Sequence, residues 1–203
     1  MNSNTAAAIM PTAYLSFDIE ADGPSPAHNS MLSLGIAGLT KDKMEVFTWQ
    51  KNFYARPGKK ADPKCMTEFW AVETEAWAFV NTDRVDPIEG FKDLVSKLAG
   101  LRQTHKIEWV AWPSAYDWQW LNCYYQDMIE ADPSTAYPYL GFKATCASTI
   151  WKFYMKSTQT SRNQENLLWD KFSEGVKGNH NSLMDARSQG LRFINLMNHA
   201  GAF

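Results

Sequence analysis

The sequence predicts an α/β domain built on a sheet of mixed strand direction. Three strand-like segments follow one another near the start, at residues 14–20, 31–39 and 44–54. The short polar turn at 40–43 indicates that the last two form an antiparallel hairpin. Further along the chain, helical and strand-like segments alternate, which is typical of a sheet covered by helices.

The first strand has two distinct faces. In residues 14–20, YLSFDIE, the side chains alternate with a period of two, so apolar Leu15, Phe17 and Ile19 share one face. The opposite face carries Tyr14, Ser16, Asp18 and Glu20. Residues 21–29 are rich in Gly, Pro and Asp and are predicted to form a loop. Residues 66–80 follow later with a helical pattern of apolar side chains.

The clearest helix start lies at Asp86. This residue suits the N-cap position, Pro87 suits the first helical position, and Glu89 has the spacing of a capping box. An apolar stripe follows at helical spacing, and Gly100 is predicted to end the helix.

The second half of the chain continues the alternation. A strand is predicted at 107–112, a helix at 115–129, a loop at 132–141 and a short last strand at 142–145. Three further helices are expected at 147–154, 162–172 and 183–198. No repeat or linker divides the chain, so we expect one domain at residues 13–203 after a disordered tail at 1–12.

Net charge, cysteine count and the length of apolar runs exclude several classes of protein. The chain has 203 residues and a formal net charge of −2, so it lacks the strongly basic balance of a protein that binds long stretches of nucleic acid. Three widely spaced cysteines suggest neither a zinc site nor a disulfide framework, and we expect reduced thiols in the cytoplasm. No run of 18 apolar residues occurs, so no membrane partner is expected.

Asp18 and Glu20 form the first group of candidate functional residues. The period of a strand places both carboxylates on one face at its end, where a hard divalent cation would relieve their repulsion. The alternative is a polar strand with two hydrated acids. Asp117 follows the strand at 107–112 and opens the next helix; either it belongs to a site at a strand end or it only favours the helix dipole.

His180 and Asp185 form the second group, at the entry to the last helix. Here too a simpler interpretation exists, because Ser182 and Asp185 have the spacing of a capping box. A histidine in a loop is also commonly an ordinary surface residue.

The order of these five residues resembles the DEDDh 3′–5′ exonucleases, a group that includes the proofreading subunit of bacterial DNA polymerase, RNase T and oligoribonuclease. SFDIEADGP at 16–24 resembles the first motif, and MLSLGIAG at 31–38 resembles the strand after it. WPSAYDWQWL at 112–121 and HNSLMDARSQ at 180–189 resemble the middle and third motifs. The resemblance covers about residues 14–197 and extends to small exoribonuclease-like proteins of bacteria and their viruses.

Three positions depart from the family pattern. Ala21 stands where Thr or Ser is common, Ser114 where Asn is common, and Ser182 where Ala is usual. These positions concern contacts with substrate, whereas the charged residues of the motifs are all present.

The resemblance implies a ribonuclease H-like fold, with a five-stranded mixed sheet and helices on both faces. It also implies a 3′–5′ exonuclease in which Asp18, Glu20, Asp117 and Asp185 hold two Mg²⁺ or Mn²⁺ ions, oxygen ligands being what these hard metals prefer. His180 would act as the general base, and the products would be nucleoside 5′-monophosphates.

The expected partner is the 3′ end of a single-stranded nucleic acid, with RNA favoured over DNA, and a homodimer is a further expectation. Candidate substrate contacts are Ala21, Met31, Tyr116 and Trp118, although core packing explains the large side chains equally well. The basic loop at 56–60 is a candidate phosphate contact or a hydrated loop. Alternatives are a non-catalytic nucleic-acid-binding module on the same fold, a purely structural domain, and a DNA proofreading exonuclease.

Overall fold

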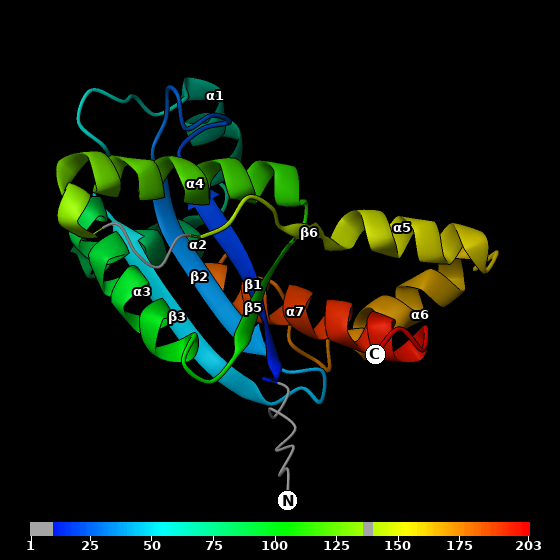
Figure 1. Cartoon of the computed structure of the whole chain (residues 1–203). Coiled ribbons are helices and arrows are strands. Elements are labelled where there is room, and N and C mark those ends of the chain that lie inside the picture. The colour runs from blue at the N-terminus through cyan, green and yellow to red at the C-terminus, as the bar shows by residue number, and fades with distance from the viewer. Residues whose placement is uncertain (1–9, 136–139) are drawn as a thin grey trace, which may run out of the picture.

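The computed structural model describes residues 10–135 and 140–203. Residues 1–9 of the predicted tail therefore lie outside the described part. One sheet organises the molecule (Figure 1). Its strand order is β4-β3-β2-β1-β5-β6. The strands are β1 (Thr12–Ala21), β2 (Met31–Leu39), β3 (Glu45–Phe53), β4 (Arg84–Val85), β5 (Lys106–Ala111) and β6 (Thr145–Cys146).

The predicted mixed sheet is confirmed, but its predicted strand number is wrong. β1, β2 and β3 form an antiparallel meander, whereas β4, β5 and β6 each run parallel to their neighbour. The sheet has six strands instead of five because the two-residue strand β4 pairs with the end of β3. So short a strand has no periodic pattern and depends on its partner for its hydrogen bonds.

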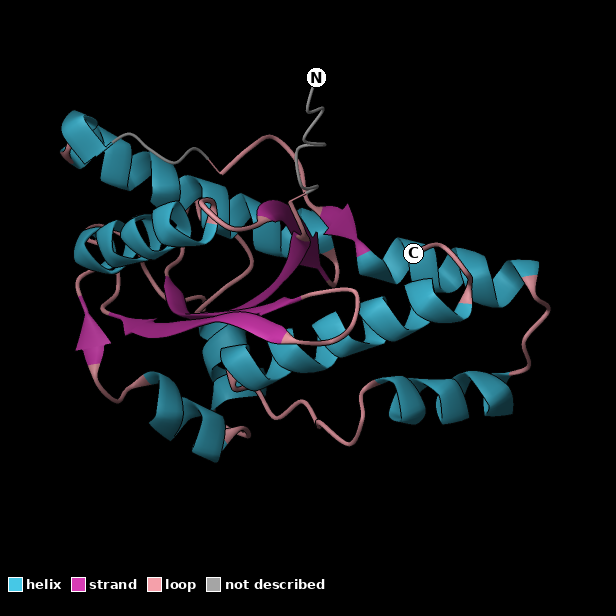
Figure 2. Cartoon of the chain, turned by 60° about the horizontal axis from the view of Figure 1, so that its bottom comes forward, coloured by secondary structure: helices cyan, strands magenta, loops and turns pink. Residues whose placement is uncertain are grey.

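Helices cover both faces of the sheet, as predicted (Figure 2). α3 (Pro87–Leu101) and α4 (Ser114–Ala131) pack on the face that carries the main hydrophobic core, which includes Leu15, Phe17 and Ile19. α7 (Ser182–His199) packs on the other face, against β1 and β2. Asp18 and Glu20 therefore lie on the face that α7 covers.

The segment predicted as one helix at 66–80 is divided. A short α1 (Pro63–Cys65) runs into a π-helical turn, η1 (Met66–Trp70), and α2 (Thr74–Val80) follows after a break. The buried Trp70 donates a hydrogen bond of 3.0 Å from its indole nitrogen to the carbonyl oxygen of Ala21. This long-range contact fixes the wide turn, and the local pattern does not reveal it.

The predicted start of α3 is confirmed, and its predicted end is wrong by one residue. The side chain of Asp86 accepts hydrogen bonds from the backbone N–H groups of Ile88 and Glu89. Gly100 does not stop the helix, which continues to Leu101 with Arg102 as its C-cap in helical conformation. The short last strand likewise lies at Thr145–Cys146, later than the predicted 142–145.

α5 (Ala147–Ser157) and α6 (Arg162–Phe172) form a helical hairpin that extends from one side of the sheet (Figure 1). Trp151, Trp169 and Phe172 pack together where the two helices meet α7. A short helical turn, η2 (Pro133–Thr135), follows α4.

Candidate active site

The site begins at the C-terminal end of β1. Asp18 is paired with Gly35 of β2, and Glu20 with Ser33. On the other side, pairing with β5 ends at Ser16 and Val110, so the last residues of β1 extend beyond β5. Glu20 is 7% exposed and Asp18 is half-buried. The end of β1 thus presents two largely enclosed carboxylates next to an open strand edge.

Asp117 reaches this strand edge from the first turn of α4. β5 ends at Ala111, the chain passes the cis Trp112–Pro113 bond, and α4 begins at Ser114. The carboxylate of Asp117 is 2% exposed and receives backbone hydrogen bonds, including one from Ile19 of β1. Its Oδ2 atom is buried and has no hydrogen-bond partner among the described residues.

α7 approaches the sheet at a glycine. A Cβ atom at Gly35 would overlap the backbone of Ser182 and Leu183, so the first turn of α7 rests directly on the backbone of β2. Because Asp18 is the cross-strand partner of Gly35, this contact brings the start of α7 to the first carboxylates.

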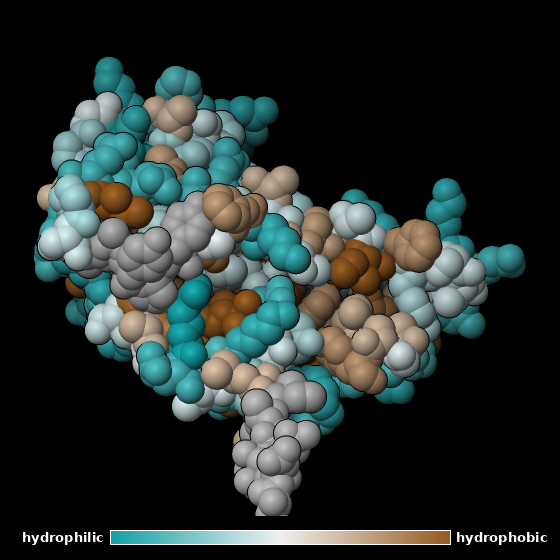
Figure 3. Space-filling view, in the orientation of Figure 1, coloured by the Kyte–Doolittle hydropathy of each residue, from teal (hydrophilic) through white to brown (hydrophobic). Residues whose placement is uncertain are grey.

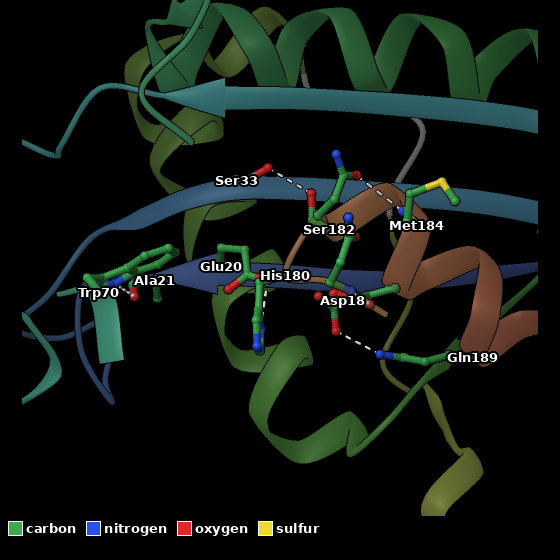
Figure 4. A network of polar contacts seen from close by, with 12 residues as sticks. Asp18, Glu20, Ala21, Ser33, Trp70, His180, Ser182, Met184 and Gln189 are labelled. Carbon is green, nitrogen blue, oxygen red and sulfur yellow. Dashed lines mark hydrogen bonds and ion pairs between the residues drawn. The ribbon is translucent and has the colours of Figure 1, made fainter. Parts of the chain in front are cut away.

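Polar contacts hold the first turn of α7 in place (Figure 4). The hydroxyl oxygens of Ser33 and Ser182 lie 2.7 Å apart in a buried position, and the Gln50 side chain donates to Ser182 and to Asn181. Asn181 is the N-cap, since its side chain accepts a hydrogen bond from the N–H of Met184. The capping-box interpretation of Ser182 and Asp185 is therefore wrong, because the Ser182 hydroxyl contacts the sheet.

Asp185 and His180 lie where the preceding loop meets α7. Asp185 accepts a hydrogen bond of 3.2 Å from the N–H of Asn179, and a Cβ at Gly178 would overlap the carboxylate. His180 has a left-handed backbone with φ of 57°, which is uncommon for a residue with a side chain. Its Nδ1 atom lies 3.9 Å from Oε1 of Glu20, and the side chain is 43% exposed.

Two residues of the site were not predicted from the sequence. Gln189, one turn after Asp185 on α7, donates a hydrogen bond of 2.7 Å to Oδ1 of Asp18 (Figure 4). Phe69 of η1 meets the ring of His180 edge-on, with 4.9 Å between ring centroids. Gln189 has an ordinary polar position on its helix, and Phe69 reads as an apolar core position, so only the tertiary structure reveals their contacts.

The four carboxyl groups make one electrostatic unit. Burial, together with the charges of Asp117, Glu20 and Asp185, raises the pKa of Asp18 well above its usual range. Burial and the neighbouring charges raise the pKa of Glu20 to about 9, and burial raises the pKa of Asp117 to about 7. Burial also raises the pKa of Asp185, although the nearby His180 acts in the opposite direction. Without a cation, the folded protein therefore disfavours full ionisation of this cluster.

The donor set fits a hard divalent cation. Potential ligand atoms of Glu20, His180 and Asp185 all lie within 4.8 Å of one another. The unpartnered Oδ2 of Asp117 adds a further oxygen to the same region. Enclosed carboxylates with an unsatisfied oxygen supply the ligands that such a cation prefers, and its charge would favour the ionised form that burial opposes.

A hollow of about 520 Å³ adjoins this cluster through Phe69, which lines the hollow and also contacts the ring of His180. Its lining includes Phe69 and Tyr116, and the Tyr116 hydroxyl lies 3.4 Å from the carbonyl oxygen of Gly23. The predicted contact Tyr116 thus borders the hollow. Its complete lining is Gly23, Pro24, Asp62, Lys64, Cys65, Glu68, Phe69 and Tyr116.

The structure places the other predicted substrate contacts differently. Met31 is fully buried in the main core, and its backbone N–H donates to the Tyr124 hydroxyl. Trp118 is partly buried and packs against Phe17 at the border of the same core. Ala21 is 8% exposed, and its carbonyl oxygen already accepts the hydrogen bond from Trp70. Core packing therefore accounts for the position of Met31, whereas the role of the partly buried Trp118 stays a prediction.

The basic loop at 56–60 is partly occupied by internal contacts. Arg56 forms an ion pair of 2.8 Å with Asp127 of α4 and lies over the ring of Tyr124. Lys59 donates a hydrogen bond to the carbonyl oxygen of Ala27. These contacts anchor the loop to the body of the protein.

The sequence is similar to that of a named exonuclease. The chain is 22% identical over 178 residues to "3'-5' DNA exonuclease Cap18" from Escherichia coli, and the match covers 87% of each protein. The chain is therefore similar to this 3′–5′ exonuclease over most of the length of both proteins. No family model matches the sequence.

Solved structures of several nucleases share the fold of this chain. The chain superposes on cell-death related nuclease 4 (CRN-4) with a TM-score of 0.61 at 10% identity over 93% of its length. The TM-score is 0.53 for a full-length 3'-exonuclease, at 16% identity over 99% of the chain. It is 0.58 for the RNase domain of yeast Pop2, at 14% identity over 95%. The chain spans 64% of the length of the first two proteins and 78% of the third.

Within residues 10–135 and 140–203, every helix is too short or too polar to cross a lipid bilayer.

Proposed function

We propose that this chain is a metal-dependent 3′–5′ exonuclease that removes nucleoside 5′-monophosphates from single-stranded nucleic acid. The observation that carries the proposal is the convergence of four carboxylates and an imidazole at the end of β1, from three separate parts of the chain. A non-catalytic binding module would have no need for these five side chains, because their enclosed carboxylates repel one another.

Asp18, Glu20, Asp117 and Asp185 would hold two Mg²⁺ or Mn²⁺ ions. Two such ions would activate the attacking water and offset the negative charge that develops on the leaving 3′ oxygen. The hydrogen bond from Gln189 orients the Asp18 carboxylate, and backbone N–H groups orient those of Asp117 and Asp185. These contacts restrict the acids to one arrangement before a substrate arrives.

His180 is the proposed general base. Its ring stands at the edge of the cluster, close to Glu20, and it is exposed enough to meet a water molecule. A neutral imidazole nitrogen there would take the proton from the attacking water and pass it to solvent. The edge-on contact with Phe69 and the left-handed backbone hold the ring toward the carboxylates.

The hollow beside the cluster is the proposed position of the terminal nucleotide. Phe69 and Tyr116 on its wall offer aromatic surface to a base, and stacking of this kind tolerates any base. Specificity for the sugar stays a prediction: RNA is the substrate expected from the sequence, whereas the relative from Escherichia coli is named for DNA. Matched RNA and DNA strands in one assay will measure this preference.

The test uses strands labelled at the 5′ end, with Mn²⁺ or Mg²⁺ present. The expected products are a ladder that shortens from the 3′ end, and a strand with a blocked 3′ terminus should resist. Asp18→Asn should nearly abolish turnover, whereas Asp42→Asn, an exposed acid in the turn between β2 and β3, should not change it. Equal turnover by folded Asp18→Asn, or internal cleavage of a circular strand, would refute the proposal.

A further inference from the structure

α5 differs in charge from the rest of this slightly acidic chain. Between Asp132 and Glu165 the sequence contains no acidic residue, while Lys143, Lys152, Lys156 and Arg162 lie in the same stretch. Arg162 pairs with Glu165. The three lysines form no ion pair with any carboxylate among residues 10–135 and 140–203.

Packing fixes which face of α5 meets solvent. Its inner residues, including Trp151 and Met155, are buried, and the Trp151 indole donates a hydrogen bond of 2.9 Å to Glu165. The outer residues recur at the spacing of one helical face. They are Thr149, Lys152, Phe153 and Lys156, all exposed, and we call them the outer face of α5.

Phe153 is the unusual member of the outer face. Its side chain is 74% exposed, and lysines lie one residue before it and three residues after it. The space-filling view shows apolar and hydrophilic residues side by side over α5 (Figure 3). An exposed aromatic ring among unpaired cations matches the way proteins hold a single strand, with cations on phosphates and rings on bases.

The position of α5 relates this face to the proposed active site. β6 pairs with the end of β5 through Val110–Thr145 and Ala111–Cys146, and α5 starts directly after β6. α4, which carries Asp117, starts just past the end of β5. The two helices therefore begin side by side, and α5 extends away from the carboxylates for about 16 Å, given 1.5 Å per residue.

We propose that the outer face of α5, with Lys143 before it, binds the part of a single strand that lies upstream of the 3′ end held in the active site. This proposal rests on the exonuclease function proposed above. Binding at α5 would then depend on the length of the substrate: long strands reach it and the shortest ones do not.

Kinetics with substrates of two lengths test the proposal. For Lys152→Ala/Lys156→Ala, KM for a single strand of about 20 nucleotides should rise roughly tenfold at low salt, while kcat stays unchanged. Turnover of a trinucleotide should equal that of the parent protein. Loss of two phosphate contacts should reduce the slope of log KM against log salt by about 1.4, at 0.7 per contact for single strands.

The matched control is Lys41→Ala/Lys97→Ala. It removes the same charge from two exposed lysines that lie outside α5 and pair with Asp42 and Asp93. If both double variants raise KM for the long strand equally, or neither does, α5 is not the strand-binding face. Circular dichroism confirms that the variants are folded.

Phe153 provides a second, independent measurement. Phe153→Ala should raise KM for the long strand about fivefold or more, and Phe153→Trp should restore it, because stacking needs an aromatic ring. Sedimentation of the same variants tests a second copy of the chain as the occupant. A dimer that Phe153→Ala dissociates without any change in KM would make the face a contact between copies, and the proposal would be wrong.

The design separates failure of this proposal from failure of the proposed function. If the parent protein with Mn²⁺ does not degrade even the trinucleotide, the exonuclease proposal fails. Fluorescence anisotropy of a labelled long strand, in chelator, then tests α5 by itself. Weaker binding by Lys152→Ala/Lys156→Ala than by the lysine control supports the strand-binding face, and equal binding overturns it.

Discussion

Neutralising Asp117 should stabilise the protein when no metal is present. Burial raises the pKa of this carboxyl group from 3.8 to about 7. Each unit of pKa shift corresponds to about 1.36 kcal/mol, so about three units set a ceiling of about 4 kcal/mol on the cost of ionising Asp117 in the folded state. Relaxation around the charge and burial of the new amide reduce this gain. We expect Asp117→Asn to raise the free energy of unfolding by about 1–3 kcal/mol at about pH 8.

The pH dependence follows from the direction of the shift. Because the folded pKa is the higher one, the folded protein keeps the proton that the unfolded chain has already lost. Below pH 3.8 both states are protonated and the carboxyl group has no effect relative to a neutral side chain. Between that value and about pH 7 stability falls as pH rises, and above pH 7 the full penalty remains. The benefit of Asp117→Asn should therefore appear at high pH and vanish in acid.

Thermal unfolding in chelator measures this effect. For a chain of this length, 1 kcal/mol shifts Tm by about 2–4 °C, so Asp117→Asn should melt several degrees above the parent protein at about pH 8. Near pH 4 the two melting temperatures should nearly coincide. Mn²⁺ should raise the Tm of the parent more than that of the variant, since the parent keeps the full set of ligands. Asp42→Asn is the control. A gain of the same size at both pH values, or none at about pH 8, would refute the electrostatic reasoning.

Three further predictions concern activity. His180→Ala should lower turnover by roughly 10²–10⁴-fold while Mn²⁺ affinity survives; lost affinity with a nearly normal metal-saturated rate would make His180 a ligand instead of the base. Activity should disappear in chelator and return with Mg²⁺ or Mn²⁺. Ca²⁺ should restore it poorly, because its looser coordination geometry positions water less well. Full activity in excess chelator would contradict the metal requirement. Gly35→Ala should reduce both turnover and Tm, because the added Cβ would displace Ser182 and Leu183. The usual cost of such overpacking is a destabilisation of at least about 1–3 kcal/mol. Unchanged turnover would show that the position of α7 is not critical for activity.

Local patterns sufficed for the parts of the fold that depend on local chemistry. The period-two alternation of β1 placed Asp18 and Glu20 on one face, and Asp86 with Pro87 marked the start of α3. β4 and the π-helical turn η1 were not predictable, because the first depends on pairing with β3 and the second on the bond from Trp70 to Ala21.

The same distinction applies to the site. The order of the motifs identifies the four acids and His180 as candidate site residues, and their catalytic roles stay predictions. Nothing in the sequence showed that Phe69 would meet His180 or that Gln189 would orient Asp18. Such contacts join residues that are far apart along the chain, and only the packing of helices on the sheet determines them.

The glycine contact between β2 and α7 divides the site into two parts with different tolerance to change. Asp18 and Asp185 are linked where backbone meets backbone at Gly35, so any larger residue at this position would push α7 away from the sheet. Asp117, in contrast, belongs to α4, and the position of α4 on the sheet depends on large core side chains such as Phe17 and Trp120. Substitutions that loosen this core should therefore first shift Asp117 relative to the other acids, with the pair on β1 and α7 intact.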